Sequence, residues 1–261
     1  MTIESLDGLD PKLKFGLYRF SVWCGLIVLV ANTVAFFFLG KLFPPPSPSA
    51  GVQEVYQFFM GNRSAILWSV IIMAIFAPFF YFFAVVTSLQ MRRIEGGFGL
   101  LSYTQLTTAV IAPTGWIYPM SAMAVAAYRP DRAPDLVYLV SDTFWLTMVG
   151  VAFVFSINIF VIGLAAVADR RPRPVFPRWF GYANFFFALI FAPGVFVYAF
   201  TDGPLAWNGL FALWIPSTAF FFWKIMMITC LLRAVNSEEA EERQAASAVL
   251  DAPAGQHAPA V

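Results

Sequence analysis

The sequence predicts an all-α integral membrane protein: a polytopic bundle of about six transmembrane helices with both termini in the cytoplasm. Of its 261 residues, 60% are hydrophobic and 12% are charged, and the mean hydropathy is +0.73. A soluble domain carries about 25% charged residues to cover its surface. The shortage of charge indicates that much of the surface faces lipid, so the bilayer is the first expected partner.

Six apolar runs account for this composition. Each is close to or above the roughly 20 residues that an α-helix needs to cross about 30 Å of hydrocarbon. We expect the spans at about 15–43, 64–89, 99–128, 137–168, 179–200 and 208–232. The chain then divides into a cytoplasmic lead-in (1–15), a transmembrane domain (16–233) and a charged, then Ala/Pro-rich tail (234–261). For the tail we expect a frayed helix followed by disorder.

Basic residues near the helix ends predict the orientation, because Lys and Arg are retained on the cytoplasmic side. One set of connections holds Lys41, Arg63, Arg129 and Arg132. The larger set, which we assign to the cytoplasm, comprises Lys12, Lys14, Arg19, Arg92, Arg93, Arg170, Arg171, Arg173, Arg178, Arg233 and Arg243. We interpret the chain as a protein of a bacterial cytoplasmic (inner) membrane.

Several chemistries are disfavoured by what the sequence lacks. His257 is the single histidine, and Cys24 and Cys230 lie inside apolar runs, whereas a histidine-ligated metal needs several converging imidazoles. We therefore predict no metal and no cofactor. A net charge of +1 with scattered basic residues argues against nucleic-acid binding. No G-x-S-x-G, P-loop or G-x-G-x-x-G motif is found.

Lys224 is the sharpest functional signal. It lies nine residues before Arg233 in an otherwise apolar run, so its Cα is about 13 Å from that helix end. An extended lysine reaches only about 6 Å, too short to place the ammonium among the headgroups. An intramembrane charge is a functional-site hypothesis by default. The alternative is a structural lysine capped by carbonyls or by a neighbouring amide.

Polar residues of other spans lie at a matching depth. Gln105 and Thr108 share one face of the third span, Asn158 is in the fourth and Asn184 in the fifth. We expect these side chains to converge with Lys224 inside the bundle as a ligand-binding or structural polar cluster. The alternative is that each amide makes a separate interhelical hydrogen bond that only aids packing.

Prolines predict interruptions of the helices. Pro113 and Pro119 lie inside the third span, where we expect a kink or break near mid-membrane. An Ile-Phe-Ala-Pro sequence ends at Pro78 in the second span and again at Pro193 in the fifth. In a three-plus-three arrangement this is the pattern of an inverted-topology repeat with a site at the midplane. Coincidence in a chain rich in Phe and Ala is the alternative.

Three function classes follow. The first is a non-enzymatic carrier or binding protein for an apolar or anionic small molecule, which would use Lys224 and the proline-broken helices. The second is an accessory subunit that contacts partner membrane subunits. The third is a membrane-embedded enzyme acting on a lipophilic substrate. We rank the first two above the third. The 30 phenylalanines could form a ligand wall, but we interpret them as lipid-facing packing.

Overall fold

The computed structural model describes residues 9–97 and 99–250, and these form helices joined by loops and turns, with no strand among them. Residues 1–8, 98 and 251–261, which include most of the predicted lead-in and the Ala/Pro-rich end of the tail, lie outside the described residues. The all-helical class and the six runs are confirmed. The helices long and apolar enough to cross a membrane are Pro11–Leu39, Arg63–Glu95, Leu100–Tyr128, Pro134–Ala168, Arg178–Tyr198 and Gly203–Ala248.

Most of these spans are interrupted or change helix type along their length. The first consists of α1 (Pro11–Thr33) and the π-helix η1 (Val34–Leu39), the second of α3 (Arg63–Phe76) and α4 (Phe79–Glu95), and the third of α5 (Leu100–Tyr128) alone. The fourth consists of α6 (Pro134–Gly150) and α7 (Ala152–Ala168), and the fifth of α8 (Arg178–Phe191) and the 3₁₀-helix η2 (Ala192–Tyr198). The sixth contains the 3₁₀-helix η3 (Gly203–Leu205), the π-helix η4 (Leu210–Trp214) and α9 (Ile215–Leu250).

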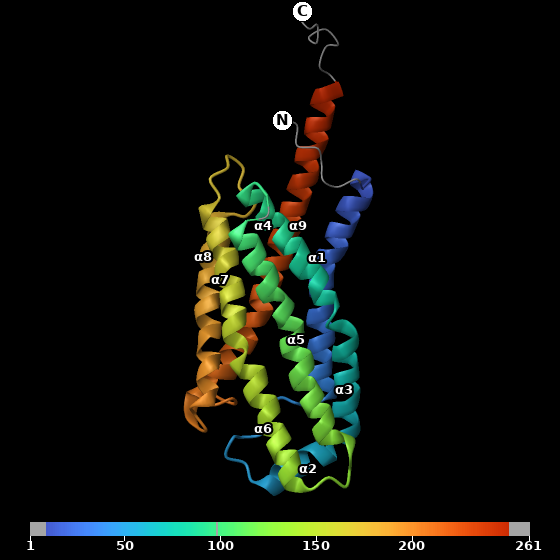
Figure 1. Cartoon of the computed structure of the whole chain (residues 1–261), viewed down its shortest axis with the longest axis vertical. Helices are drawn as coiled ribbons and strands as arrows, with labels where there is room; N and C mark the ends of the chain where they lie inside the picture. Colours follow the sequence, from blue (N-terminus) through green and yellow to red (C-terminus); the bar gives the residue numbers. More distant parts are fainter. Residues whose placement is uncertain (1–8, 98, 251–261) are drawn as a thin grey trace, which may run out of the picture.

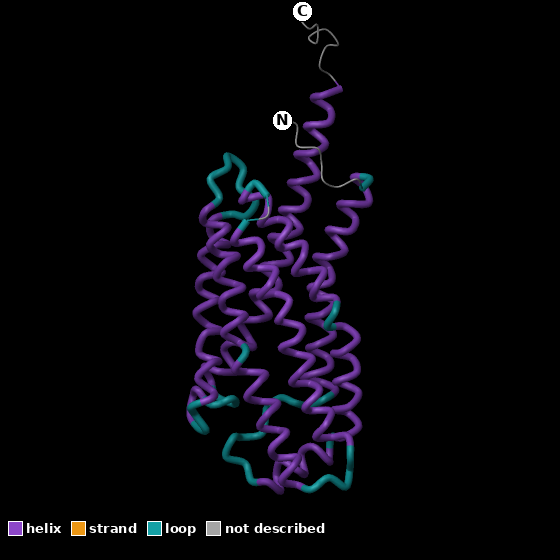
Figure 2. The backbone as a smooth tube through the Cα atoms, in the orientation of Figure 1, coloured by secondary structure: helices purple, strands orange, loops and turns teal. Residues whose placement is uncertain are grey.

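The spans form a closed ring. α1 packs against α9, α9 against α8, α8 against α7, α7 against α5, α5 against α3 and α4, and α4 against α1. The helices run roughly parallel to one long axis (Figure 1), and most of the connections lie at its two ends (Figure 2). Two apolar cores fill the ring. One, around Phe176, Trp223 and Met227, lies toward the termini, and the other, around Phe59 and Trp145, lies toward the opposite end.

The sequence does not predict α2 (Val52–Gly61), which lies at the end of the bundle opposite the termini (Figure 1) and packs against α6. Val55 and Phe59 are buried four residues apart, whereas Glu54 and Gln57 are exposed. That spacing gives one apolar face. A ten-residue amphipathic helix escapes a search for long apolar runs, because half of its surface remains polar.

The two Ile-Phe-Ala-Pro sequences lie where helices end. α3 ends at Phe76, and Ala77 and Pro78 form the turn seen within the second span in Figure 2. α8 ends at Phe191, and Pro193 lies in the first turn of η2. By contrast, α5 continues through Pro113 and Pro119, so of the expected kink or break the break is absent from the described helix and the kink stays a prediction. Each proline removes only one backbone donor, and the remaining hydrogen bonds of a long helix can carry it past that loss.

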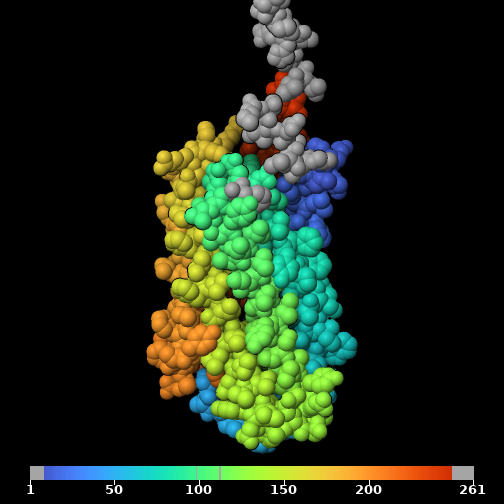
Figure 3. Space-filling model, in the orientation of Figure 1, coloured from blue at the N-terminus to red at the C-terminus, as the bar shows by residue number. Residues whose placement is uncertain are grey.

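α9 continues well beyond the predicted end of the sixth span. It is 36 residues long, or about 54 Å at 1.5 Å per residue, and its last turns project past the other helices (Figure 3). Lys14 Nζ lies 2.8 Å from Glu242 Oε1, and Arg93 Nη2 lies 2.9 Å from Glu241 Oε2. These ion pairs fasten the acidic stretch of α9 to α1 and α4, so the helix expected from residue 234 onward is held against the bundle through this stretch.

The connection between α7 and α8 is organised by the buried carboxylate of Asp169. It accepts hydrogen bonds from the side chain of Arg171 at 2.9 and 3.0 Å and from the backbone N–H of Val175 at 2.8 Å. Burial alone would raise the pKa of this carboxyl, but the hydrogen bonds and the charge of Arg171 outweigh it and hold the pKa below its usual range. These hydrogen bonds therefore hold the conformation of this basic loop, at the end of the bundle where the chain termini lie.

Candidate functional site

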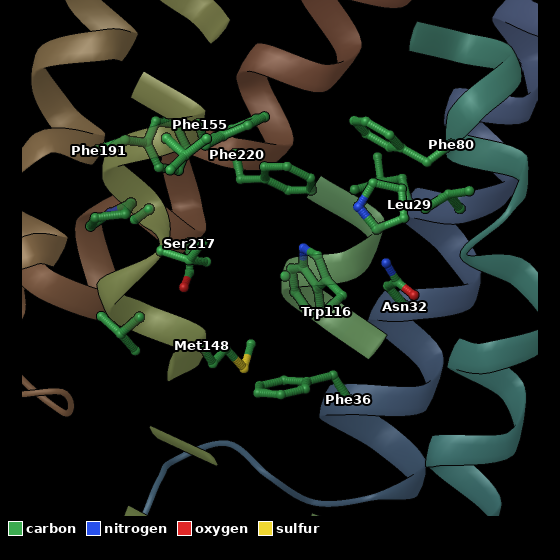
Figure 4. Close-up of a pocket in the computed structure, with 18 of the residues that line it drawn as sticks. Leu29, Asn32, Phe36, Phe80, Trp116, Met148, Phe155, Phe191, Ser217 and Phe220 are labelled. Carbon is green, nitrogen blue, oxygen red and sulfur yellow. The ribbon is translucent and has the colours of Figure 1, made fainter. Parts of the chain in front are cut away.

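A cavity of about 180 Å³ lies inside the ring, between the two apolar cores, and residues of all six spans line it. Its wall is largely aliphatic and aromatic (Figure 4). The labelled apolar residues are Leu29, Phe36, Phe80, Trp116, Met148, Phe155, Phe191 and Phe220. An apolar cavity of about 150 Å³ engineered into another protein stays dry and binds benzene or xenon. This cavity is therefore large enough for an apolar molecule the size of a single ring.

Irregular helix segments contribute to this wall. The π-helix η1 supplies Phe36 and Phe37, the turn between α3 and α4 supplies Ala77, and the π-helix η4 supplies Ala212 and Leu213. A helix that changes its geometry at mid-length cannot keep regular ridge-into-groove packing with its neighbours, which leaves space. π-Helical turns are rare and occur frequently at functional sites.

A few polar groups interrupt the apolar wall. Asn32 and Ser217 lie on opposite sides of the cavity in Figure 4, and Thr108 also lines it. Asn32 Oδ1 is buried without a hydrogen-bond partner among the described residues. A neighbouring cavity of about 30 Å³ shares Asn32, Ala77 and Trp116 with the main one. It has room for a water molecule, which needs about 10–15 Å³, and such a water would meet the unpaired amide oxygen.

Lys224 is fully buried inside the bundle, in the core nearer the termini. The faces of four aromatic rings surround its ammonium, and we call them the aromatic cage: Phe80 and Phe83 at 4.3 Å from Nζ to the ring centroid, Trp223 at 5.0 Å and Phe220 at 5.3 Å. Within residues 9–97 and 99–250, Nζ has no hydrogen-bond partner. Lys224 therefore makes no direct hydrogen bond to Asn158, Asn184 or Gln105 in the described structure, and the convergence of these side chains on one site stays a prediction.

Two of the three amides make hydrogen bonds to other groups, whereas Gln105 Oε1 is buried without a partner among the described residues. Asn158 Nδ2 donates to the backbone oxygen of Gln105 at 2.8 Å and to Thr108 Oγ1 at 2.9 Å, which joins α7 to α5. Asn184 Oδ1 accepts from Trp223 Nε1 at 3.0 Å, which joins α8 to α9. Asn158 and Asn184 thus bond to different helices, and Asn184 positions one ring of the aromatic cage, that of Trp223.

The aromatic cage and the cavity share two rings. Phe80 and Phe220 line the cavity and also contact the ammonium of Lys224. Only one layer of side chains therefore separates the amine from the central space. Thr108 links the Asn158 hydrogen bonds to the same cavity.

The sequence does hold a signal for the cage that is easily overlooked. Phe220 precedes Lys224 by four residues, and Phe80 precedes Phe83 by three, so each pair shares a helix face. The interpretation of the phenylalanines as lipid-facing packing suits Phe38 and Phe222, which are 73% and 65% exposed, but it is wrong for the rings of the cage.

Comparison with protein-family models, with curated proteins and with solved structures finds no match to this chain. Within the described part of the chain, no group of three or more His, Cys, Asp or Glu side chains could hold a metal ion. The function is therefore argued from the cavity, the aromatic cage and the six spans.

Proposed function

We propose that this chain is an integral membrane protein, with both termini in the cytoplasm, that binds a small apolar molecule in its central cavity as a carrier or binding protein. The observation that carries the proposal is the cavity of about 180 Å³ lined by residues of all six spans. Pre-formed, mostly apolar concavities with a few polar groups are the usual form of small-molecule sites.

The position of the cavity supports this function over its alternatives. Carriers commonly bind their substrate near the bilayer midplane, beside interrupted helices, and here the turn at Ala77 and the end of α8 at Phe191 both meet the cavity. Among the residues described, its lining holds no carboxylate, histidine or cysteine, so the hydroxyls of Ser217 and Thr108 have no general base beside them in the wall to activate them for an enzyme. The projecting end of α9 offers a surface for a partner subunit, but in the described residues no feature of that surface favours a partner as the cavity favours a small ligand.

The orientation has a direct test. The predicted cytoplasmic loop between α7 and α8 and the turn at residues 129–133 belong to opposite ends of the bundle. The native cysteines Cys24 and Cys230 are buried. We expect a cysteine at Arg173 to react with an impermeant maleimide only from the cytoplasmic face of membrane vesicles, and one at Asp131 only from the other face. The reverse pattern contradicts the proposed topology, and labelling of both positions from one side contradicts six crossings.

Filling the cavity tests the binding function. Ser217 lies on the cavity wall, whereas Thr218, the next residue of α9, is exposed on the outer face. Ser217→Phe is expected to abolish saturable binding of fluorobenzene to the protein in nanodiscs, because the new ring occupies the space. Thr218→Phe adds the same ring outside and is expected to bind as the unmodified protein does. Fluorine NMR separates bound probe from probe dissolved in lipid. Absence of saturable binding to the unmodified protein contradicts the proposed function.

A further inference from the structure

We propose that the natural ligand carries a carboxylate that pairs with Lys224, so that the cavity and the aromatic cage together form a site for a small carboxylated amphiphile. This inference rests on the proposed function and specifies the chemical class of the ligand. The apolar body of the ligand would fill the cavity, and its acidic end would pass the rings of Phe80 and Phe220 to reach the amine.

The first argument is that the hydrogen-bonding capacity of Lys224 is unused. An ammonium has three N–H donors and no acceptor, and none of the three finds a partner among the described residues. The four ring faces of the cage attract the positive charge, as cation–π contacts do, but they do not replace oxygen acceptors. A buried polar group left in this state is unusual and calls for an unseen partner.

The second argument is that the described part of the protein supplies no anion to this amine. The ion pairs there join Lys14, Arg19, Arg93, Arg171 and Arg243 to carboxylates, and none involves Lys224. Asp142, the carboxylate within the apolar run of the fourth span, lies on α6 beside Ser141 and Phe144, whose surroundings belong to the opposite core. An anionic group that neutralises Lys224 therefore comes from a bound molecule.

The third argument is that the path from the cavity to the amine is short. The rings of Phe80 and Phe220 both line the cavity. Their centroids lie 4.3 Å and 5.3 Å, respectively, from Lys224 Nζ. Phe220 is only partly buried, and side-chain rotamers of this kind interchange without movement of the backbone. When the Phe220 ring turns aside, a carboxylate joined to a ring-sized body by a short chain reaches the ammonium.

A matched pair of probes tests the ligand class: a fluorinated phenylpropanoate and the corresponding fluorinated propylbenzene, which differ in the acidic group. In nanodiscs of uncharged lipid, the unmodified protein is expected to bind the acid more tightly than the hydrocarbon. Lys224→Met is expected to weaken binding of the acid at least about 30-fold, as loss of one partner of a buried charge pair does, and to leave the hydrocarbon unchanged. Arg233→Met, which removes an exposed basic residue of the same helix, is expected to change neither.

The outcomes separate this inference from the proposed function. If the unmodified protein binds the hydrocarbon but not the acid, the carboxylate site is wrong while the apolar cavity stands. Equal binding of the acid by Lys224→Met also overturns it. If neither probe binds, both proposals fail. The comparison of the two probes on the unmodified protein decides the question even where Lys224→Met fails to fold, because it requires no variant.

Discussion

Substitution of Gly163 by leucine is expected to cause a large loss of stability. Gly163 on α7 and Gly181 on α8 lie where these two helices pack together. A Cβ atom on Gly163 would stand 2.9 Å from the backbone oxygen of Gly181 and 2.9 Å from the ring of Phe185. A backbone oxygen cannot move aside without separating the helices, so the free energy of unfolding should fall by about 3 kcal/mol, the upper part of the range for overpacked sites. Small residues permit this kind of close approach in membrane bundles.

Gly16 provides the matched control for this substitution. It is exposed on α1, and a Cβ atom there would meet nothing within 4 Å. Gly16→Leu is expected to leave stability unchanged or to raise it slightly, because leucine favours the helix over glycine by roughly 0.7 kcal/mol. Thermal unfolding of the two variants in nanodiscs, followed by tryptophan fluorescence, compares them directly. Equal midpoints would mean that α7 and α8 do not approach as closely as described.

The spans were predictable because they depend on local composition. Roughly 20 consecutive apolar residues identify a membrane-crossing helix without reference to any other part of the chain. The continuation of α9 to Leu250 was not predictable in this way. It depends on ion pairs such as that between Lys14 and Glu242, which are 228 positions apart in the sequence. From the sequence alone, the like charges of an acidic run disfavour a helix, because the basic residues that pair with them are known only from the fold.

The candidate site was likewise predictable in part: what depends on one helix could be predicted, and what depends on packing between helices could not. The depth of Lys224 follows from counting residues along one helix, and its full burial accords with that count. Its surroundings do not follow from counting, because Phe80 and Phe83 reach it through the packing of α4 against α9. Residues at equal depth need not meet: Asn158 and Asn184 lie at suitable heights, but helix rotation directs the first to α5 and the second to Trp223.

Substitution of Lys224 by methionine is expected to stabilise the ligand-free protein. Removing a charge from water costs several kcal/mol per ion, and four ring faces without an oxygen acceptor return only part of that cost. Methionine has similar length, no charge and favourable contacts with aromatic rings. Replacement of buried charged groups by apolar ones of similar volume is often stabilising by 1–4 kcal/mol, so a rise of about 1–4 kcal/mol in the free energy of unfolding is expected here.

Lys224→Ala separates the loss of charge from the loss of volume. It removes the same ammonium but leaves a void inside the aromatic cage, and truncation of a buried side chain costs about 2–5 kcal/mol, so it should be less stable than Lys224→Met. Thermal unfolding in nanodiscs without added ligand measures both variants. If Lys224→Met is destabilised as much as Lys224→Ala, the ammonium itself holds the fold together and the residue is structural. A methionine variant that is more stable and yet has lost acid binding is the opposite result. It would mean that the protein retains Lys224 at a cost in stability, as proteins do for residues that serve a ligand.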